Sequence, residues 1–158
     1  MLLYHGSNIA IEVPRLIPSQ RLLDFGAGFY LTSDGEQAGK WALRTTLIRK
    51  DGVPTVSVFE FPETAFEELE VLSFKRPGKQ WLDFVCANRR GQTMKRKYDI
   101  VTGPVADDRT VRALNNYMGG FLSLELTLQI LRPYHLKDQY AFKTERALAF
   151  LKFKEVLI

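Results

Sequence analysis

Two short segments carry residues whose types and spacing suit the binding of a planar, hydrogen-bonding ligand. The first is His5-Gly6-Ser7, which follows an apolar run, and the second is Gly26-Ala27-Gly28-Phe29-Tyr30. Glycines allow the main chain to turn tightly or to approach a ligand closely. Trp41 follows Tyr30 by eleven residues. If Tyr30 lies on a strand and Trp41 on the next helix, their rings can converge and enclose a heterocycle between them.

Each feature alone also has a simpler structural interpretation. A Gly-x-Gly segment is commonly just a turn, and the dinucleotide-binding pattern Gly-x-Gly-x-x-Gly is absent because residue 31 is Leu. Tyr30 and Trp41 can be core or half-buried aromatic residues, and a histidine at a strand end is commonly a surface polar residue. The combination of all these features favours a ligand site.

Together, His5-Gly6-Ser7, Gly26-Ala27-Gly28-Phe29-Tyr30 and Trp41 resemble signature motifs of the ADP-ribosyltransferase superfamily, in its diphtheria-toxin and poly(ADP-ribose) polymerase branch. The resemblance implies that NAD is the substrate and that no metal is needed. It implies that His5 bonds the ribose beside the nicotinamide, and that the main chain of Gly6 and the side chain of Ser7 hold the carboxamide. The main chain at Gly28 would also approach NAD, and Tyr30 and Trp41 would stack on the two faces of the nicotinamide ring.

Nearly the full length of the chain also resembles a family of single-domain bacterial proteins of unknown function. The shared blocks are YHGS, DFGxGFYLT, QAxxWA, YDIVxGPVADD and QYxFxTExAL.

The third signature position departs from the superfamily pattern. A glutamate begins a late strand there, whereas the matching residue in this chain is Gln139. Glutamine can position a hydroxyl group but cannot act as a general base. Asp138 is adjacent, yet successive strand residues point to opposite faces, so the two cannot both face the nucleotide. Other candidate carboxylates are Glu145, Asp107 and Asp108, and capping of a helix is a competing role for the two aspartates.

These motifs lead to the hypothesis of a mono-ADP-ribosyltransferase that transfers ADP-ribose from NAD to a protein or nucleic-acid acceptor. Such a protein would act as a bacterial toxin with a cognate antitoxin, or as a phage-defence effector. Two alternatives remain open at this point. One is an NAD glycohydrolase, in which water replaces the acceptor. The other is a catalytically inactive module of the same fold that binds a nucleotide or a partner.

Composition sets further bounds on the protein. We expect one domain over residues 1–158, because 158 residues is the length of a single domain. Hydrophobic residues make up 46% of the chain, which is enough to bury one core. No apolar run is long enough to span a bilayer and no signal segment opens the chain, so we expect a cytoplasmic protein without a membrane partner. The single cysteine, Cys86, rules out an internal disulfide and is expected to be buried, and no metal-ligand spacing is present.

Basic residues account for a net charge of +4 and cluster at three places. These clusters are either solvated loops, contacts to the NAD pyrophosphate or the acceptor, or part of a nucleic-acid interface. They are Lys75-Arg76, Arg89-Arg90 and Lys95-Arg96-Lys97.

Irregularly interleaved strands and helices predict an α+β fold with a split, mainly antiparallel sheet. The resemblance implies that NAD lies in the cleft between the sheet halves. Strands are expected at 1–4, 29–32, 55–61, 69–74, 98–105, 139–143 and 153–158. Helices are expected at 34–49, 79–90, 110–118, 123–131 and 144–151, and residues 8–22 form a loop. A capping box of Ser33 and Glu36 begins the first helix, and Asp107 or Asp108 caps the third.

Overall fold

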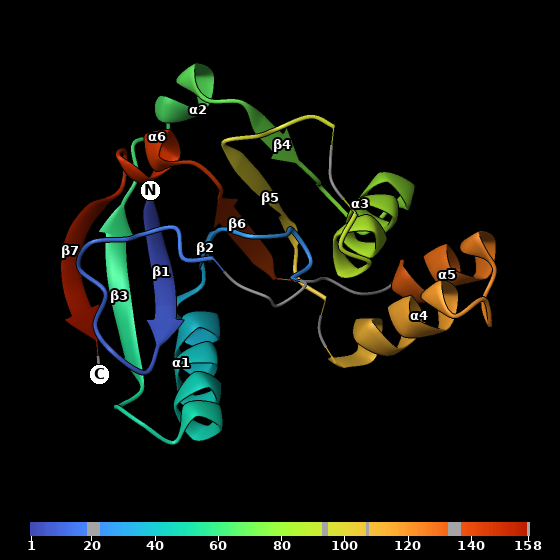
Figure 1. Cartoon of the computed structure of the whole chain (residues 1–158), viewed down its shortest axis with the longest axis horizontal. Coiled ribbons are helices and arrows are strands. Elements are labelled where there is room, and N and C mark those ends of the chain that lie inside the picture. Colours follow the sequence, from blue (N-terminus) through green and yellow to red (C-terminus); the bar gives the residue numbers. More distant parts are fainter. Residues whose placement is uncertain (19–22, 93–94, 107, 133–136, 158) are drawn as a thin grey trace.

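The computed structural model describes residues 1–18, 23–92, 95–106, 108–132 and 137–157, without the side chains of residues 108 and 109 (Figure 1). Its strands are β1 (Leu2–Ser7), β2 (Phe29–Leu31), β3 (Thr55–Glu60), β4 (Val71–Ser73), β5 (Ile100–Pro104), β6 (Asp138–Phe142) and β7 (Lys152–Leu157). Its helices are α1 (Gly35–Arg49), α2 (Ala65–Glu68), α3 (Lys79–Arg89), α4 (Asp108–Met118), α5 (Leu124–Leu131) and α6 (Glu145–Leu148).

The strands form two sheets. One has the order β1-β3-β7, with both pairs antiparallel. The other has the order β2-β6-β5-β4, in which β4 and β5 are parallel and the other pairs are antiparallel. The predicted α+β class with mainly antiparallel pairing is therefore confirmed.

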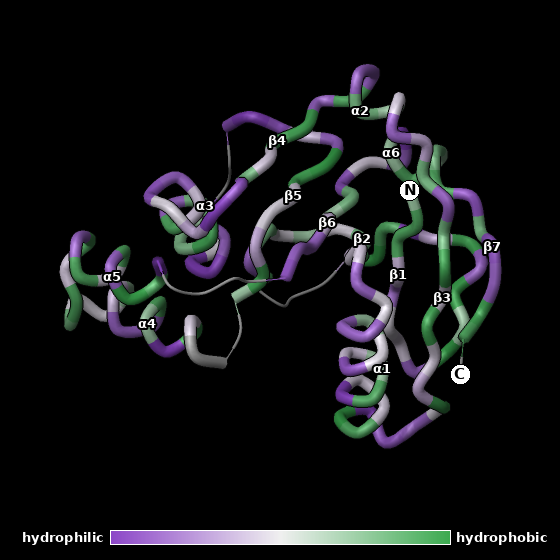
Figure 2. Tube along the Cα trace, turned by 180° about the vertical axis from the view of Figure 1, so that it is seen from behind, coloured by the Kyte–Doolittle hydropathy of each residue, from purple (hydrophilic) through white to green (hydrophobic). Residues whose placement is uncertain are grey.

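The four-stranded sheet has an apolar cluster on each face. The first cluster joins it to the three-stranded sheet, and its large members include Leu3, Phe29, Phe59 and Phe142. The second joins it to α3, α4 and α5, on the side away from β7 in Figure 1, and includes Trp81, Val101, Leu114, Leu131 and Ala141. Figure 2 shows green, apolar segments in β3 and β5 and purple stretches along the edge strand β7. The sheets and helices thus form three layers.

Trp81 is a core residue, as its position on the helical apolar face predicts. Its side chain is fully buried in α3, and its indole nitrogen donates a hydrogen bond to the carbonyl of Pro104 at 2.9 Å. This bond ties α3 to the end of β5. Cys86 on the same helix is also buried, as expected. Burial is the main factor that raises the pKa of its thiol.

Helix α1 packs against β1 and β3 through Tyr4, Ala38, Ala42 and Val56. Its N-cap is Asp34, whose carboxylate accepts a hydrogen bond from the amide of Gln37 at 3.0 Å. The predicted capping box is therefore wrong by one residue, because the hydroxyl of Ser33 donates instead to Asp138 at 2.6 Å. None of the helices in the described ranges is both long and apolar enough to cross a membrane.

Several predicted boundaries differ from the structure. The first strand continues through Ser7, because its last residues pair with β3. The predicted helix 144–151 shortens to α6, which Thr144 caps, because β7 begins at Lys152 and pairs with β3. The short helix α2 has no counterpart in the sequence prediction. Asp107, one of the two predicted helix caps, lies outside the described residues, and α4 begins at Asp108.

Candidate functional site

The two sheets meet where β1 passes β2. The amide of Tyr4 donates to the carbonyl of Thr32 at 2.8 Å, and the amide of Thr32 donates back to Tyr4 at 3.0 Å. Beside this bridge, Nδ1 of His5 lies 2.7 Å from the main-chain carbonyl of Tyr30. The structure thus brings His5 and Tyr30, two residues of the predicted site, into direct contact at the joint between the sheets.

The environment of His5 favours its neutral form. Burial lowers its pKa, and the positive charge of Arg49 acts in the same direction. Its ring stacks on Phe29, with centroids 4.3 Å apart and an interplanar angle of 25°. A carbonyl oxygen can only accept, so Nδ1 must carry the proton, and Nε2 of the neutral ring is then an acceptor. Among the described residues Nε2 has no hydrogen-bond partner, and it is therefore available to a ligand hydroxyl.

Tyr30 points away from Phe29 and toward the helical layer. Its ring packs against the cluster beneath α3, and its hydroxyl donates a hydrogen bond to the carbonyl of Gly26 at 2.6 Å. Burial is the main cause of a raised pKa of this hydroxyl, so it stays protonated. Tyr30 therefore fixes the Gly26 turn, in addition to any contact with a ligand.

Trp41 does not meet the Tyr30 ring. It is 48% exposed on α1 and makes no ring contact within the described part of the chain. One helical turn before it, the side-chain amide of Gln37 donates to the carbonyl of Asp138 at 3.0 Å. This places the stripe of α1 that carries Trp41 beside the start of β6. The two rings make no direct contact, and their enclosure of a heterocycle from its two faces stays a prediction.

Two of the motif glycines are explained by close main-chain contacts. A Cβ on Gly6 would lie 2.0 Å from the carbonyl oxygen of Ala38, so only glycine lets α1 approach β1 this closely. A Cβ on Gly28 would lie 2.8 Å from the carbonyl oxygen of Phe142 on β6. These contacts account for both glycines without a ligand, and the ligand roles of Gly6 and Gly28 stay predictions.

Ser7 is buried at the end of β1 and has a partner of its own. Its hydroxyl lies 3.5 Å from the side-chain oxygen of Asn8, which accepts a second bond from Arg49 at 2.8 Å. The amide nitrogen of Asn8 donates to the carbonyl of Asp51 at 3.1 Å. This network ties β1 to the turn after α1. The predicted contact of Ser7 with a carboxamide is untested by this arrangement.

Gln139 is the most unusual polar residue of the site. It is only 7% exposed, and its amide nitrogen has no hydrogen-bond partner among the described residues. Tyr30 lies directly opposite Ala141, and Gln139 is two residues from Ala141, so Tyr30 and Gln139 share one face of the sheet. Diagonal neighbours of this kind have main chains about 7–8 Å apart, within reach of one ligand. A buried amide without a partner costs free energy.

Asp138 faces the other side of β6, as strand alternation predicts. Its carboxylate accepts hydrogen bonds from the hydroxyl and the amide of Ser33, and one from the hydroxyl of Thr32 at 3.0 Å. It therefore holds the turn between β2 and α1. Glu145 is exposed in the first turn of α6, and nothing is described for the side chain of Asp108. Asp138 therefore does not lie beside Gln139 on its face of the sheet, and the roles of Glu145 and Asp108 as bases stay predictions.

Lys143 is a residue of this region that the sequence patterns did not single out. Its ammonium group donates to the carbonyl of Phe25 and, at 2.8 Å, to that of Ala27. The hydroxyl of Tyr30 donates to the carbonyl of Gly26 between them. The carbonyls of residues 25, 26 and 27 therefore each accept a hydrogen bond from a side chain. In the sequence, Lys143 is notable only because it lies at the end of the Gln139 strand. No sequence pattern links it to the distant Gly26 turn.

Within the described residues no group of three or more histidine, cysteine, aspartate or glutamate side chains could hold a metal ion.

Comparison with known proteins identifies the family but no activity. No curated protein and no solved structure shows a significant match to the chain. Residues 1–153 match a family described as protein of unknown function (DUF3990). This match spans nearly the whole chain, which therefore belongs to the DUF3990 family.

Proposed function

We propose that this protein binds NAD at the joint of its two sheets and acts as a mono-ADP-ribosyltransferase, which transfers ADP-ribose to an acceptor and releases nicotinamide. The observation that carries the proposal is the buried amide of Gln139, which has no partner and lies on the same face as Tyr30. An unpaired buried amide fits a site whose partner is a ligand. The two sheets that meet beside His5 are compatible with the split-sheet architecture that the motifs imply.

In this reaction the main task of the protein is to bind NAD and to orient it. NAD supplies a cationic nicotinamide leaving group, and cleavage builds positive charge on the ribose. Neutral His5 accepts a hydrogen bond from a ribose hydroxyl through Nε2, while Gln139 donates one through its amide. Gln139 cannot remove a proton from the acceptor, so that proton goes to solvent, to a group of the acceptor, or to one of the candidate carboxylates Glu145, Asp107 and Asp108. The loss of the glutamate at this position favours single transfer over chain elongation.

Two further candidate functions share the same site. An inactive NAD-binding module is favoured by the amide at position 139 and by the engagement of the Tyr30 hydroxyl with Gly26. An NAD glycohydrolase would use water as the acceptor, which requires no additional protein surface. We also propose a protein or nucleic-acid acceptor and a cognate antitoxin, as the motifs imply, and a cytoplasmic location, as the composition suggests.

The deciding experiment measures nicotinamide release from NAD by the full chain, with and without total cell extract and labelled NAD. Release that depends on extract and leaves label on a macromolecule supports a transferase and identifies its acceptor. Release without extract indicates a glycohydrolase, and NAD binding without release indicates an inactive module. Gln139→Leu should abolish binding or release, whereas Gln80→Leu, at an exposed position of α3, should change neither. Absence of both NAD binding and release in the wild-type protein overturns the proposal.

A further inference from the structure

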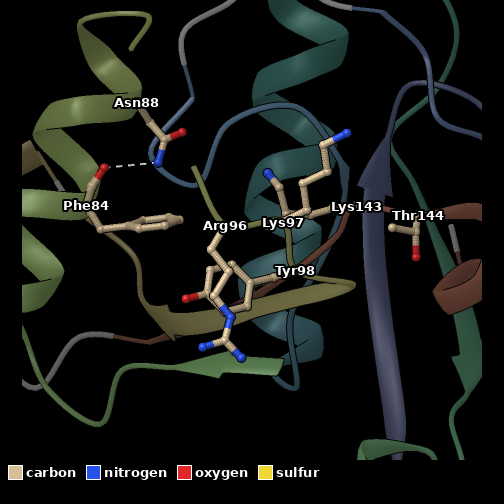
Figure 3. A pocket seen from close by; sticks show the side chains of 7 residues that line it. All are labelled: Phe84, Asn88, Arg96, Lys97, Tyr98, Lys143 and Thr144. Atoms are coloured by element: carbon tan, nitrogen blue, oxygen red, sulfur yellow. Dashed lines mark hydrogen bonds between the residues drawn. The ribbon is translucent and has the colours of Figure 1, made fainter. Parts of the chain in front are cut away.

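A pocket of about 180 Å³ lies between α3, the segment that precedes β5 and the turn from β6 to α6 (Figure 3). Three of its lining residues are cationic, and no described lining residue is acidic. The lining consists of Phe84, Asn88, Arg96, Lys97, Tyr98, Lys143 and Thr144. A pocket with this excess of positive charge selects an anion.

Lys143 supplies a charge without a counter-ion. It has no carboxylate within ion-pair distance in the described part of the chain, and two of its three N–H groups are bonded to the carbonyls of Phe25 and Ala27. Its third N–H is available to a ligand. Partial burial lowers the pKa of this amine to about 8, because the charged form is poorly solvated. An anion in the pocket would restore the lost solvation of the ammonium group.

Lys97 adds a second available cation. It is exposed and forms no ion pair with any described residue. In Figure 3 the side chains of Lys97 and Lys143 extend in the same direction, while the guanidinium of Arg96 lies at the other end of the group beside Tyr98. Two ammonium groups on one side of a pocket suit the several oxygens of a phosphate group.

The acidic groups near the pocket are already engaged. Glu70 pairs with Arg96 at 2.9 Å. Asp99 accepts hydrogen bonds from the hydroxyl of Thr144 at 2.6 Å and from the amide of Glu70 at 3.0 Å. The charges of Lys97 and Lys143 are thus left without compensation by these carboxylates.

Arg96 and Tyr98 give the same pocket a planar surface. The guanidinium carbon of Arg96 lies over the Tyr98 ring, 5.2 Å from its centroid. Guanidinium groups and aromatic rings are the surfaces on which nucleobases stack in proteins that bind single strands. The pocket is smaller than the roughly 300–1,000 Å³ of a typical small-molecule site, so it suits only part of such a ligand.

We propose that this pocket binds the phosphate group of a nucleotide, free or within a strand. Lys97 and Lys143 contact the phosphate oxygens, and the base stacks on the Arg96–Tyr98 pair at the rim. This inference goes beyond the proposed function and does not depend on NAD turnover. It assigns a role to the Lys95-Arg96-Lys97 cluster, which the motif residues of the NAD site leave unused.

Calorimetric titration of the full chain with three probes tests the proposal: inorganic phosphate, AMP and a single-stranded hexamer of adenylate. None of them can release nicotinamide, and because AMP is half of NAD, the Lys97→Gln variant is needed to distinguish binding in this pocket from binding at the NAD site. The variant is Lys97→Gln, which removes an exposed charge that has no ion pair or side-chain hydrogen bond with any described residue. The matched control is Lys154→Gln, an exposed lysine on β7 that has no ion pair among the described residues. Lys143→Met is a second variant, whose folding is checked by circular dichroism.

We expect AMP or the hexamer to bind and Lys97→Gln to weaken binding by roughly two- to fivefold, as for the loss of one favourable exposed charge pair. Preference for AMP would identify a free nucleotide as the ligand, and preference for the hexamer would identify a strand. The proposal is overturned if neither binds at millimolar concentration. It is also overturned if Lys154→Gln weakens binding as much as Lys97→Gln, or if Lys97→Gln has no effect.

Discussion

Replacement of Gln139 by leucine should stabilise the fold and at the same time remove the proposed NAD function. The amide nitrogen of Gln139 is buried without a partner, and leucine has a similar volume without polar atoms. An unsatisfied buried polar group costs about 1–3 kcal/mol, which the substitution recovers. For a chain of this length, 1 kcal/mol shifts the melting temperature by about 2–4 °C. The expected rise in Tm is therefore roughly 2–12 °C.

Two measurements on the same protein preparation test this reasoning. Calorimetric unfolding gives the change in Tm, and NAD binding or nicotinamide release gives the change in function. Gln80→Leu, the exposed counterpart on α3, should leave both nearly unchanged. A lower Tm for Gln139→Leu would show that the amide is paired within the fold, and the argument for a ligand there would fail. A higher Tm with undiminished NAD binding would show that the unpaired amide of Gln139 does not contact NAD.

Three further predictions concern neighbouring residues of the joint and the turn. Gly6→Ala should lower the free energy of unfolding by about 3 kcal/mol, because the new Cβ meets the main chain of α1. Gly39→Ala should instead raise the free energy of unfolding by about 0.5–1 kcal/mol, because nothing lies within 4 Å of its new Cβ. Urea unfolding of both would contradict this explanation if the two variants behaved alike. The lowered pKa of His5 means that the unfolded chain binds the proton more readily, so stability should fall as pH drops below 6.5. His5→Gln should remove that part of the pH dependence, and an unchanged profile would refute it. The pKa of Lys143, about 8 instead of 10.5, predicts that stability rises with pH between these values, and Lys143→Met should flatten this rise in urea titrations. An equal slope in both proteins would count against the desolvation of this amine.

Local signals predicted most of the secondary structure. Helix α3, which has a periodic apolar face, and helix α5, which Ser123 caps, were placed to within about a residue at each end. Strand alternation also predicted that Asp138 and Gln139 face opposite sides of β6. The failures have nonlocal causes. The length of α6 is limited by the pairing of β7 with β3, and β7 lies on the other sheet.

The candidate site was only partly accessible from sequence. The contact between His5 and Tyr30 agrees with the association of the two motifs, although the bond is made by the main chain of Tyr30. The lack of a direct contact between the Tyr30 and Trp41 rings was not predictable, because it depends on how α1 packs against β1 and β3. Lys143 escaped notice because its contacts with the Gly26 turn join residues that are more than a hundred positions apart. No local pattern records such a contact.

The narrow joint between the sheets has a consequence for hydrogen exchange. Only the amides of Tyr4 and Thr32 form the reciprocal bridge there among the described residues, while neighbouring strands within each sheet share longer ladders. Local opening of two hydrogen bonds exposes these amides to deuterium without unfolding either sheet. Their exchange should therefore be faster than that of the amides inside β3. A ligand that contacts both His5 and Gln139 would bridge the two sheets and slow exchange at this pair, which gives a readout of occupancy that requires no turnover.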